Sequence, residues 1–179
     1  AVEFGSSMAG CTNYLNSITP IIDSMLAIDP TIKITLATIG TESSNWNTII
    51  KNSSLVALGK IYGISPHYFP GEPLLGVANV EAELTMLADT AQIHGLKIIT
   101  GDYAPRVFNT TSLASQDSAM QWGGANLCTD FLLLMSQIPN VERVGFWAYG
   151  IPSAVWHPIR INSLGNYTLM PVADLYKKL

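Results

Sequence analysis

The chain has 179 residues, of which 48% are hydrophobic and only 12% are charged. This length is enough for a sizeable core, and we expect residues 1–179 to form one domain. The formal charge of −4 and nine scattered Lys and Arg residues argue against nucleic acid as a partner, because phosphate neutralisation needs clustered basic side chains. No apolar run reaches the roughly 20 residues that a membrane-spanning helix needs.

Short β-branched runs alternate with longer helical patterns, which is typical of β/α units built around a parallel sheet. A strand is expected at 2–5, and the apolar spacing of residues 14–26 predicts a helix that ends before Pro30. The next elements are a strand, a helix followed by Gly59 at its C-terminal cap, and another strand, expected at 32–39, 46–58 and 61–65.

The second half of the chain continues the alternation without an internal repeat. The most regular amphipathic pattern predicts a helix over 80–94, stopped by Gly95, and a strand follows at 96–100. A helix at 118–136, a strand at 141–149 and a closing helix at 170–179 complete the prediction. The segment between the last two, which carries Trp156 and His157, is expected to be a loop.

Aromatic and polar residues gather where the predicted strands end. In parallel β/α barrels the functional site lies at the carboxyl ends of the strands. Rings that stack on sugar C–H faces, beside a few hydrogen-bonding groups, favour a carbohydrate site. For any one ring, packing in the core is the commoner role, and the carbohydrate interpretation rests on their coincidence at the strand ends. The candidate sugar-binding residues are Trp46, His67, Tyr68, Tyr103, Trp147 and Tyr149. His94 and His157 are expected to be surface residues.

Several short motifs, in order, resemble the second half of the (β/α)8 barrel of clan A glycoside hydrolases, in particular retaining α-L-arabinofuranosidase-like enzymes. They lie at 2–7, 29–33, 64–69, 101–104 and 145–147. The resemblance implies an α/β fold with barrel strands 4 to 8 and their helices, a partial TIM barrel. Five strands alone leave open sheet edges. We therefore expect a partner, either the missing N-terminal half-barrel or another protein chain, unless the strands form an open doubly wound sheet.

The resemblance also assigns the catalytic positions. Asp102 stands at the nucleophile position, and Ser7 stands where the family carries its acid/base glutamate. Retaining hydrolysis uses two carboxyl groups about 5 to 5.5 Å apart. An alcohol cannot donate a proton near neutral pH, so the pair is degenerate unless Glu42 or Glu72 replaces Ser7. A Ser7–His67–Asp102 triad lacks the nucleophile elbow of serine hydrolases.

These features predict an extracellular, glycoside-hydrolase-like domain with a degenerate catalytic pair, which binds carbohydrate or acts as a scaffold. One alternative is an active retaining glycosidase with Asp102 as nucleophile, and another is a structural assembly subunit. Whether the chain is an enzyme stays open. No cofactor is expected.

Three N-glycosylation sequons, at Asn52, Asn109 and Asn166, indicate a protein of the secretory pathway. Cys11 and Cys128 are either one disulfide or two buried free thiols. Their separation along the chain has none of the clustered spacing of a metal site, and no metal is expected.

Overall fold

The structure, a computed structural model, describes residues 7–39, 45–68, 78–103, 121–146, 159–161 and 165–178. Its elements, in chain order, are α1 (Met8–Ile28), β1 (Thr35–Ile39), α2 (Asn45–Lys51), α3 (Ser54–Ala57), β2 (Gly63–Tyr68), α4 (Ala78–Ile93), β3 (Lys97–Tyr103), α6 (Trp122–Ser136), β4 (Val141–Phe146), β5 (Ile159–Ile161), β6 (Tyr167–Leu169) and α7 (Pro171–Lys178). The strand predicted at 2–5 and residues 147–149 of the last predicted strand lie outside the described residues.

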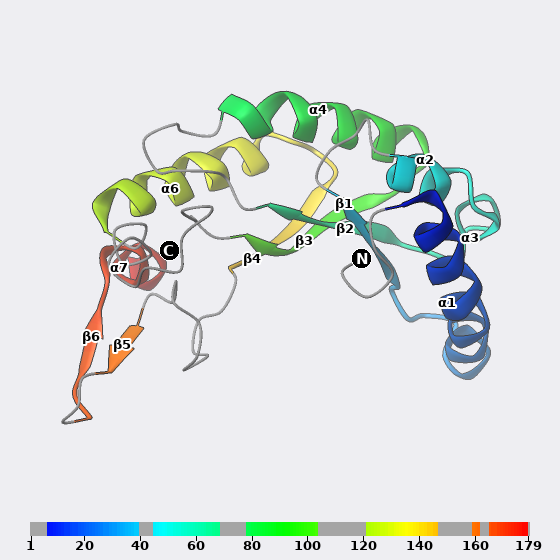
Figure 1. Cartoon of the computed structure of the whole chain (residues 1–179), viewed down its shortest axis with the longest axis horizontal. Coiled ribbons are helices and arrows are strands. Elements are labelled where there is room, and N and C mark those ends of the chain that lie inside the picture. The colour runs from blue at the N-terminus through cyan, green and yellow to red at the C-terminus, as the bar shows by residue number, and fades with distance from the viewer. Residues whose placement is uncertain are drawn as a thin grey trace. The chain divides into compact units, whose positions relative to one another are not determined.

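Four strands form one parallel sheet in the order β1-β2-β3-β4, which confirms the predicted parallel β/α fold (Figure 1). β1 pairs with β2 in parallel, with Thr35 beside Gly63 and Ile39 beside His67. Each crossover between neighbouring strands contains a helix, as a parallel pairing requires. The strands have the same order in the sheet as in the sequence, so each strand lies next to the one that precedes it in the chain.

The chain divides into two compact units, each made of several segments. The first unit comprises Ala1–His67, Ala82–Thr100 and Ile138–Arg143, and the second comprises Tyr68–Glu81, Gly101–Gln137 and Val144–Leu179. The first unit therefore holds α1, β1 and most of β2, together with the amino-terminal parts of β3 and β4. The second unit holds α6, α7 and the β5–β6 pair.

In the first unit, α1 starts earlier than its apolar pattern predicts. The Ser7 hydroxyl accepts a hydrogen bond from Gly10 N–H at 3.0 Å, so Ser7 is the N-cap and the helix begins at Met8. At the other end, Asp29 is the C-terminal cap residue, as the following Pro30 predicts. The buried residues of α1 include Cys11 and Ile22.

The single helix predicted over 46–58 is wrong, because the structure has two short helices there. α2 ends at Lys51, and Ser53 caps α3 by accepting a hydrogen bond from Val56 N–H at 3.4 Å. Polar residues such as Asn52 and Ser53 bond to nearby backbone groups and favour caps over helix interiors. The predicted turn glycines are confirmed, since Gly59 and Gly95 both have positive φ.

The core of the first unit lies on one face of the sheet. Leu36 of β1, Ile64 of β2 and Ile98 of β3 are all at most 2% exposed. α4 presents Leu84, Leu87, Ala88 and Ala91, which are buried at the three- and four-residue spacing that the sequence shows. Burial at alternate strand positions and at one helical stripe is the pattern of a helix-covered sheet.

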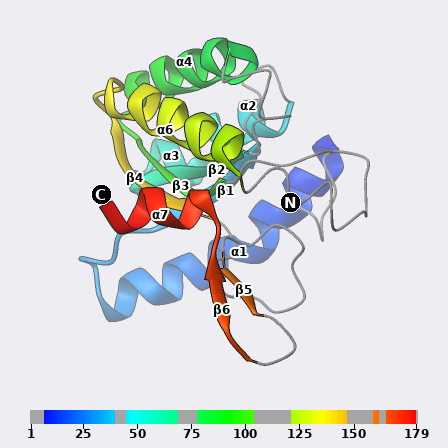
Figure 2. The same cartoon turned by 90° about the vertical axis from the view of Figure 1, so that its left-hand side faces the viewer.

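In the second unit, α6 buries one stripe that includes Leu127, Phe131 and Met135, and α7 packs against α6. β5 and β6 form an antiparallel pair, with β6 adjoining α7 (Figure 2). The expectation of a loop between the last strand and the closing helix is therefore wrong for 159–161 and 167–169. Three-residue strands are too short for a periodic pattern to reveal them.

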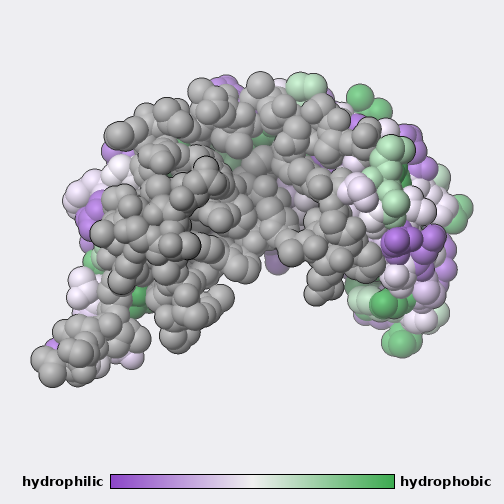
Figure 3. All heavy atoms as spheres, viewed as in Figure 1, coloured by the Kyte–Doolittle hydropathy of each residue, from purple (hydrophilic) through white to green (hydrophobic). Residues whose placement is uncertain are grey.

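Some hydrophobic side chains remain on the surface of the first unit. Ile21, Met25 and Ile28 of α1 and Leu58 beside α3 are exposed, and hydrophobic patches are visible among polar residues where these helices lie (Figure 3). Ile21, Met25 and Ile28 follow one another at four- and three-residue spacing and so form one apolar stripe on α1. An isolated exposed side chain such as Leu58 is ordinary. None of the helices within the described residues has the length and apolar character needed to cross a bilayer.

Candidate functional site

The candidate site residues at the ends of β2 and β3 lie on neighbouring strands. His67 and Tyr68 are the last two residues of β2, and Asp102 and Tyr103 are the last two of β3. Lys97 N–H donates to the Tyr62 carbonyl at 3.0 Å, near the start of both strands. Because parallel strands run in the same direction, the carboxyl-terminal ends of β2 and β3 lie at the same end of the sheet. The strand-end positions expected for His67, Tyr68 and Asp102 are thus observed.

Ser7, which stands at the acid/base position of the resemblance, has a structural bond instead. Its hydroxyl accepts from Gly10 N–H, and its carbonyl accepts from Cys11 N–H at 3.0 Å. The side-chain bond satisfies Gly10 N–H, a backbone donor of the first turn that would otherwise lack a partner, and the bond from Cys11 is the first regular hydrogen bond of α1. The Ser7 side chain thereby stabilises the helix start, and as an alcohol it offers no acid near neutral pH.

Trp46 of α2 is fully buried, although the sequence offered it as a sugar-binding ring. Its ring has 0% exposure and stacks on Tyr14 of α1, with the ring centroids 5.5 Å apart. Its Nε1 donates to the Ala37 carbonyl of β1 at 3.1 Å. The ring has no face open to a sugar in the described structure, and it joins α1, α2 and β1 in the core.

Tyr103 lies at the end of β3 and is also fully buried. Its ring stacks on Phe131 of α6, with centroids 4.7 Å apart and an angle of 28° between the ring planes. Stacking of this kind adds to the hydrophobic contribution of both rings. Like Trp46, Tyr103 is a core residue in the described structure. Of His67 and Tyr68 the structure describes the place in β2, and their side chains lie outside the description.

Several expected site residues lie outside the described residues. These are Trp147 and Tyr149, the substitute acids Glu42 and Glu72, the surface candidate His157 and the sequon residue Asn109. Of the residues that the structure does describe, Asn52 and Asn166 are exposed, as an N-glycan would require, and His94 is exposed at the end of α4.

The two cysteines are free and buried, which resolves the alternatives left open by the sequence in favour of thiols. Burial raises the pKa of the Cys11 thiol to about 11, and burial also raises the pKa of Cys128. Thiols kept protonated in this way are poor nucleophiles and poor metal ligands. Across the described part of the chain, no three His, Cys, Asp or Glu residues are placed to hold a metal ion.

A polar cluster at the amino ends of the strands was not anticipated. Lys33 Nζ donates to the Tyr62 hydroxyl at 3.2 Å and lies 4.2 Å from the centre of its ring. The Tyr62 hydroxyl in turn donates to Glu142, whose carboxylate lies 3.7 Å from Lys33 Nζ. These bonds lower the pKa of Glu142, chiefly through Tyr62, and raise the pKa of Lys33.

The residues of the polar cluster lie far apart in sequence. Lys33 precedes β1, Tyr62 precedes β2 and Glu142 lies within β4. Lys33 is 61% exposed, so solvent screens the ion pair and its net contribution is small. In β/α barrels the amino-terminal face serves stability rather than catalysis. No sequence pattern could have revealed the cluster, because separately each of its residues is an ordinary surface residue.

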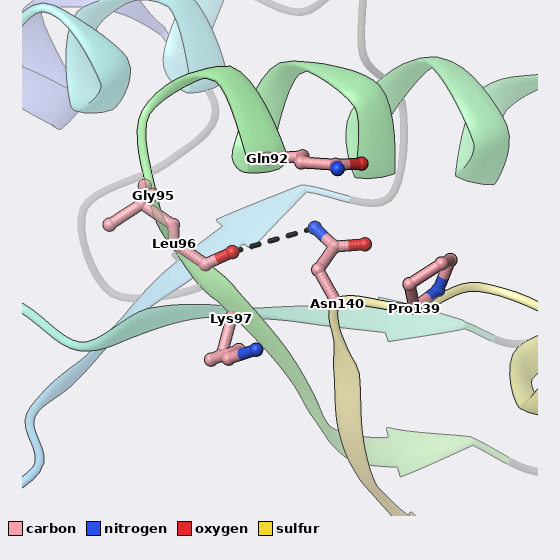
Figure 4. Close-up of a pocket in the computed structure, with 6 residues that line it drawn as sticks. All are labelled: Gln92, Gly95, Leu96, Lys97, Pro139 and Asn140. Carbon is pink, nitrogen blue, oxygen red and sulfur yellow. Dashed lines mark hydrogen bonds between the residues drawn. The ribbon is translucent and has the colours of Figure 1, made fainter.

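A pocket of about 220 Å³ lies at the amino ends of β3 and β4 (Figure 4), lined by Gln92, Gly95, Leu96, Lys97, Pro139 and Asn140. The Asn140 amide donates to the Ala88 carbonyl at 2.9 Å and to the Leu96 carbonyl at 3.4 Å, which ties the start of β4 to α4. The volume is below that of usual small-molecule sites. This pocket lies at the opposite ends of the strands from His67 and Asp102.

Among solved structures, the chain is similar to TsXylA, an intracellular xylanase from Thermoanaerobacterium saccharolyticum, solved as a mutant in complex with xylotetraose. The TM-score is 0.54 at 16% sequence identity, and the match covers 86% of this chain and 47% of the xylanase chain. At this identity the similarity shows the fold alone. The chain spans about half the length of that xylanase, and its parallel β/α sheet matches about half of a glycoside-hydrolase TIM barrel. No protein-family model matches the chain, and no curated protein does.

Proposed function

We propose that this chain is a glycoside-hydrolase-like barrel segment with a degenerate catalytic pair, which binds carbohydrate at the carboxyl ends of its strands. The observation that supports the proposal is the Ser7 hydroxyl, which caps α1 by accepting from Gly10 N–H. The resemblance assigns Ser7 to the position at which a retaining enzyme needs an acid. The finer resemblance, to α-L-arabinofuranosidase-like enzymes, is part of the proposal. It assigns the nucleophile position to Asp102.

Asp102 by itself is not expected to support efficient hydrolysis. Its side chain is one methylene shorter than the glutamate of the family motif, and a misplacement of about 1 Å can cost on the order of 100-fold in rate. Without an acid, the leaving oxygen also has to depart unprotonated. A binding role needs neither group in a catalytic geometry. His67 and Tyr68 end β2, which neighbours the strand that carries Asp102. We assign the hydrogen-bonding and stacking contacts with the sugar to these two residues by their chemistry.

Calorimetric titration with xylotetraose and with arabino-oligosaccharides tests the binding role. We expect measurable binding, weakened about tenfold by His67→Ala, which corresponds to the loss of roughly 1.4 kcal/mol of hydrogen bonding and packing. His94→Ala, on an exposed histidine at the end of α4, is the matched control and should bind as the parent does. Absence of binding to every sugar at millimolar concentration would favour the structural assembly subunit and contradict the proposal.

Hydrolysis of an aryl glycoside panel tests the degenerate pair separately. We expect no turnover above the buffer rate. Turnover that disappears on Asp102→Asn would show an active retaining glycosidase and refute the degenerate pair, while the sugar-binding result would stand by itself.

We further propose that the protein passes through the secretory pathway and is glycosylated. Exposure of Asn52 and Asn166, each in an acceptor sequon, supports this. The expected result is a glycan on at least one of these residues in protein purified from its natural source, detected as a mass loss on treatment with an N-glycosidase. Unmodified peptides covering both sequons would contradict it.

A further inference from the structure

The side chain of Asn140, at the start of β4, carries a buried acceptor that has no donor. Its Nδ2 donates to the Ala88 carbonyl at 2.9 Å and to the Leu96 carbonyl at 3.4 Å. Turning the amide over would set its oxygen against these two carbonyl oxygens, so the orientation of the side chain is fixed. The residue is only 6% exposed, and Oδ1 has no hydrogen-bond partner in the described part of the chain.

The place of this oxygen distinguishes it from two other buried atoms. The Thr38 and Thr100 hydroxyls also lack partners among the described residues, but neither threonine lines the pocket at the amino ends of β3 and β4. Asn140 does, and its oxygen lies on the side of the amide that faces Gln92 and Pro139 (Figure 4). A buried acceptor without a donor costs free energy, which a donor bound in the pocket would recover.

The charges around the pocket favour a neutral ligand. Lys97 lines it, and no acidic side chain within the described ranges forms an ion pair with this lysine. Gln92 and Gly95, at the carboxyl end of α4, line the same pocket. A helix carries about half a negative charge at this end, which partly offsets the ammonium group. The pocket therefore holds little net charge to attract an anion, and Lys97 repels a cation.

The walls and the volume of the pocket suit a single small ring. Leu96 and Pro139 supply apolar surface, beside the polar groups of Gln92, Lys97 and Asn140. The volume of about 220 Å³ equals roughly seven water molecules at the density of the liquid, which is room for one ring and not for an oligosaccharide. A ring with hydroxyl groups offers both the donor that Asn140 lacks and acceptors for Lys97.

We infer that this pocket binds one neutral, hydroxyl-bearing ring of monosaccharide size. One hydroxyl of the ligand donates to Asn140 Oδ1, and another accepts from Lys97 Nζ. Gln92 is exposed, so rotation of its side chain opens the way to the buried oxygen. All the lining residues belong to the first compact unit, and the inference does not depend on sugar binding at the carboxyl ends of the strands.

Titration of the ¹⁵N-labelled full chain with D-glucose, followed by two-dimensional NMR, tests the inference. We expect a dissociation constant on the order of a few millimolar. The backbone amide signals of Leu96 and Lys97 should shift, together with the side-chain amide signals of Asn140, whose oxygen gains a donor. Tetrahydropyran has the same ring without hydroxyls and should bind at least about tenfold more weakly. D-Glucosamine and D-glucuronate, with one charge each, should bind no more tightly than glucose.

Lys97→Met keeps an unbranched side chain of similar length but removes the ammonium group, and it should weaken glucose binding about tenfold. Lys33→Met is the matched control, because Lys33 is 61% exposed and lies outside the pocket. Asn140→Ala should abolish binding, but it also removes the bonds to α4 and Leu96. If that variant does not fold, the side-chain amide signals of Asn140 in the parent protein report the same contact.

Several results would overturn the inference. Asn140 side-chain signals that stay unchanged while glucose saturates the protein would show that no hydroxyl reaches Oδ1. Equal binding of tetrahydropyran would show an apolar site, and tighter binding of glucuronate would show an anion site. Shifts confined to residues at the carboxyl ends of the strands would also overturn it, while the proposed sugar binding at those ends would stand.

Discussion

Replacing Phe131 with alanine is expected to lower the free energy of unfolding by about 4 kcal/mol. The ring is fully buried on α6 and stacks on Tyr103. Its removal therefore loses the favourable free energy of burying a large aromatic group, and it also loses the stacking contact with Tyr103. Because whole domains are stable by only about 5 to 15 kcal/mol, this single change should bring the second unit close to unfolding at room temperature. Urea denaturation followed by far-UV circular dichroism measures the loss.

Leu133→Ala is the matched control for Phe131→Ala. Leu133 lies on the same helix, two residues away, but its side chain is 56% exposed. Its truncation removes little buried surface and should change stability by less than about 0.5 kcal/mol. Equal losses for the two variants would mean that Phe131 does not form the centre of the α6 packing.

Gly63→Ala is expected to cost about 3 kcal/mol, through a steric conflict within the sheet. A Cβ atom on Gly63 would lie 2.4 Å from the carbonyl oxygen of Lys97 and 3.0 Å from its carbonyl carbon. Both atoms belong to the backbone of β3, which also donates from Lys97 N–H to Tyr62. The strands would have to separate near the polar cluster of Lys33, Tyr62 and Glu142, and thermal unfolding monitored by circular dichroism should show a lowered midpoint.

Gly95→Ala separates this steric cost from the ordinary cost of replacing a glycine. Gly95 has a φ of 68°, and a Cβ atom added there would meet no other atom within 4 Å. Alanine at this position therefore meets only backbone strain of about 1 kcal/mol. A Gly63→Ala loss no larger than that of Gly95→Ala would contradict the close approach of β2 and β3.

The sequence predicted the order of strands and helices because alternating β-branched runs and helical stripes are local signals. It misplaced the start of α1, since Ser7 acts through a single cap bond and not through periodicity. The division between α2 and α3 likewise depends on Ser53, whose capping role a wider apolar pattern conceals. Local hydrogen bonds of single polar residues thus account for these two differences in element boundaries.

The candidate site was predictable in position but not in exposure. His67 and Asp102 could be placed at strand ends, because strand ends follow from the same local signals. Whether Trp46 or Tyr103 faces a ligand or the core depends on Tyr14 and Phe131, which are distant in sequence. An aromatic residue after a strand has the same local pattern in either case.

The burial of the two thiols gives the protein a pair of internal reporters. Cys11 belongs to the first compact unit and Cys128 to the second, and each is at most 1% exposed. A thiol-alkylating reagent can modify either one only when its own unit opens, so the two alkylation rates record the local opening of each unit. Peptide mapping after timed alkylation can therefore show which unit opens first, without any engineered label.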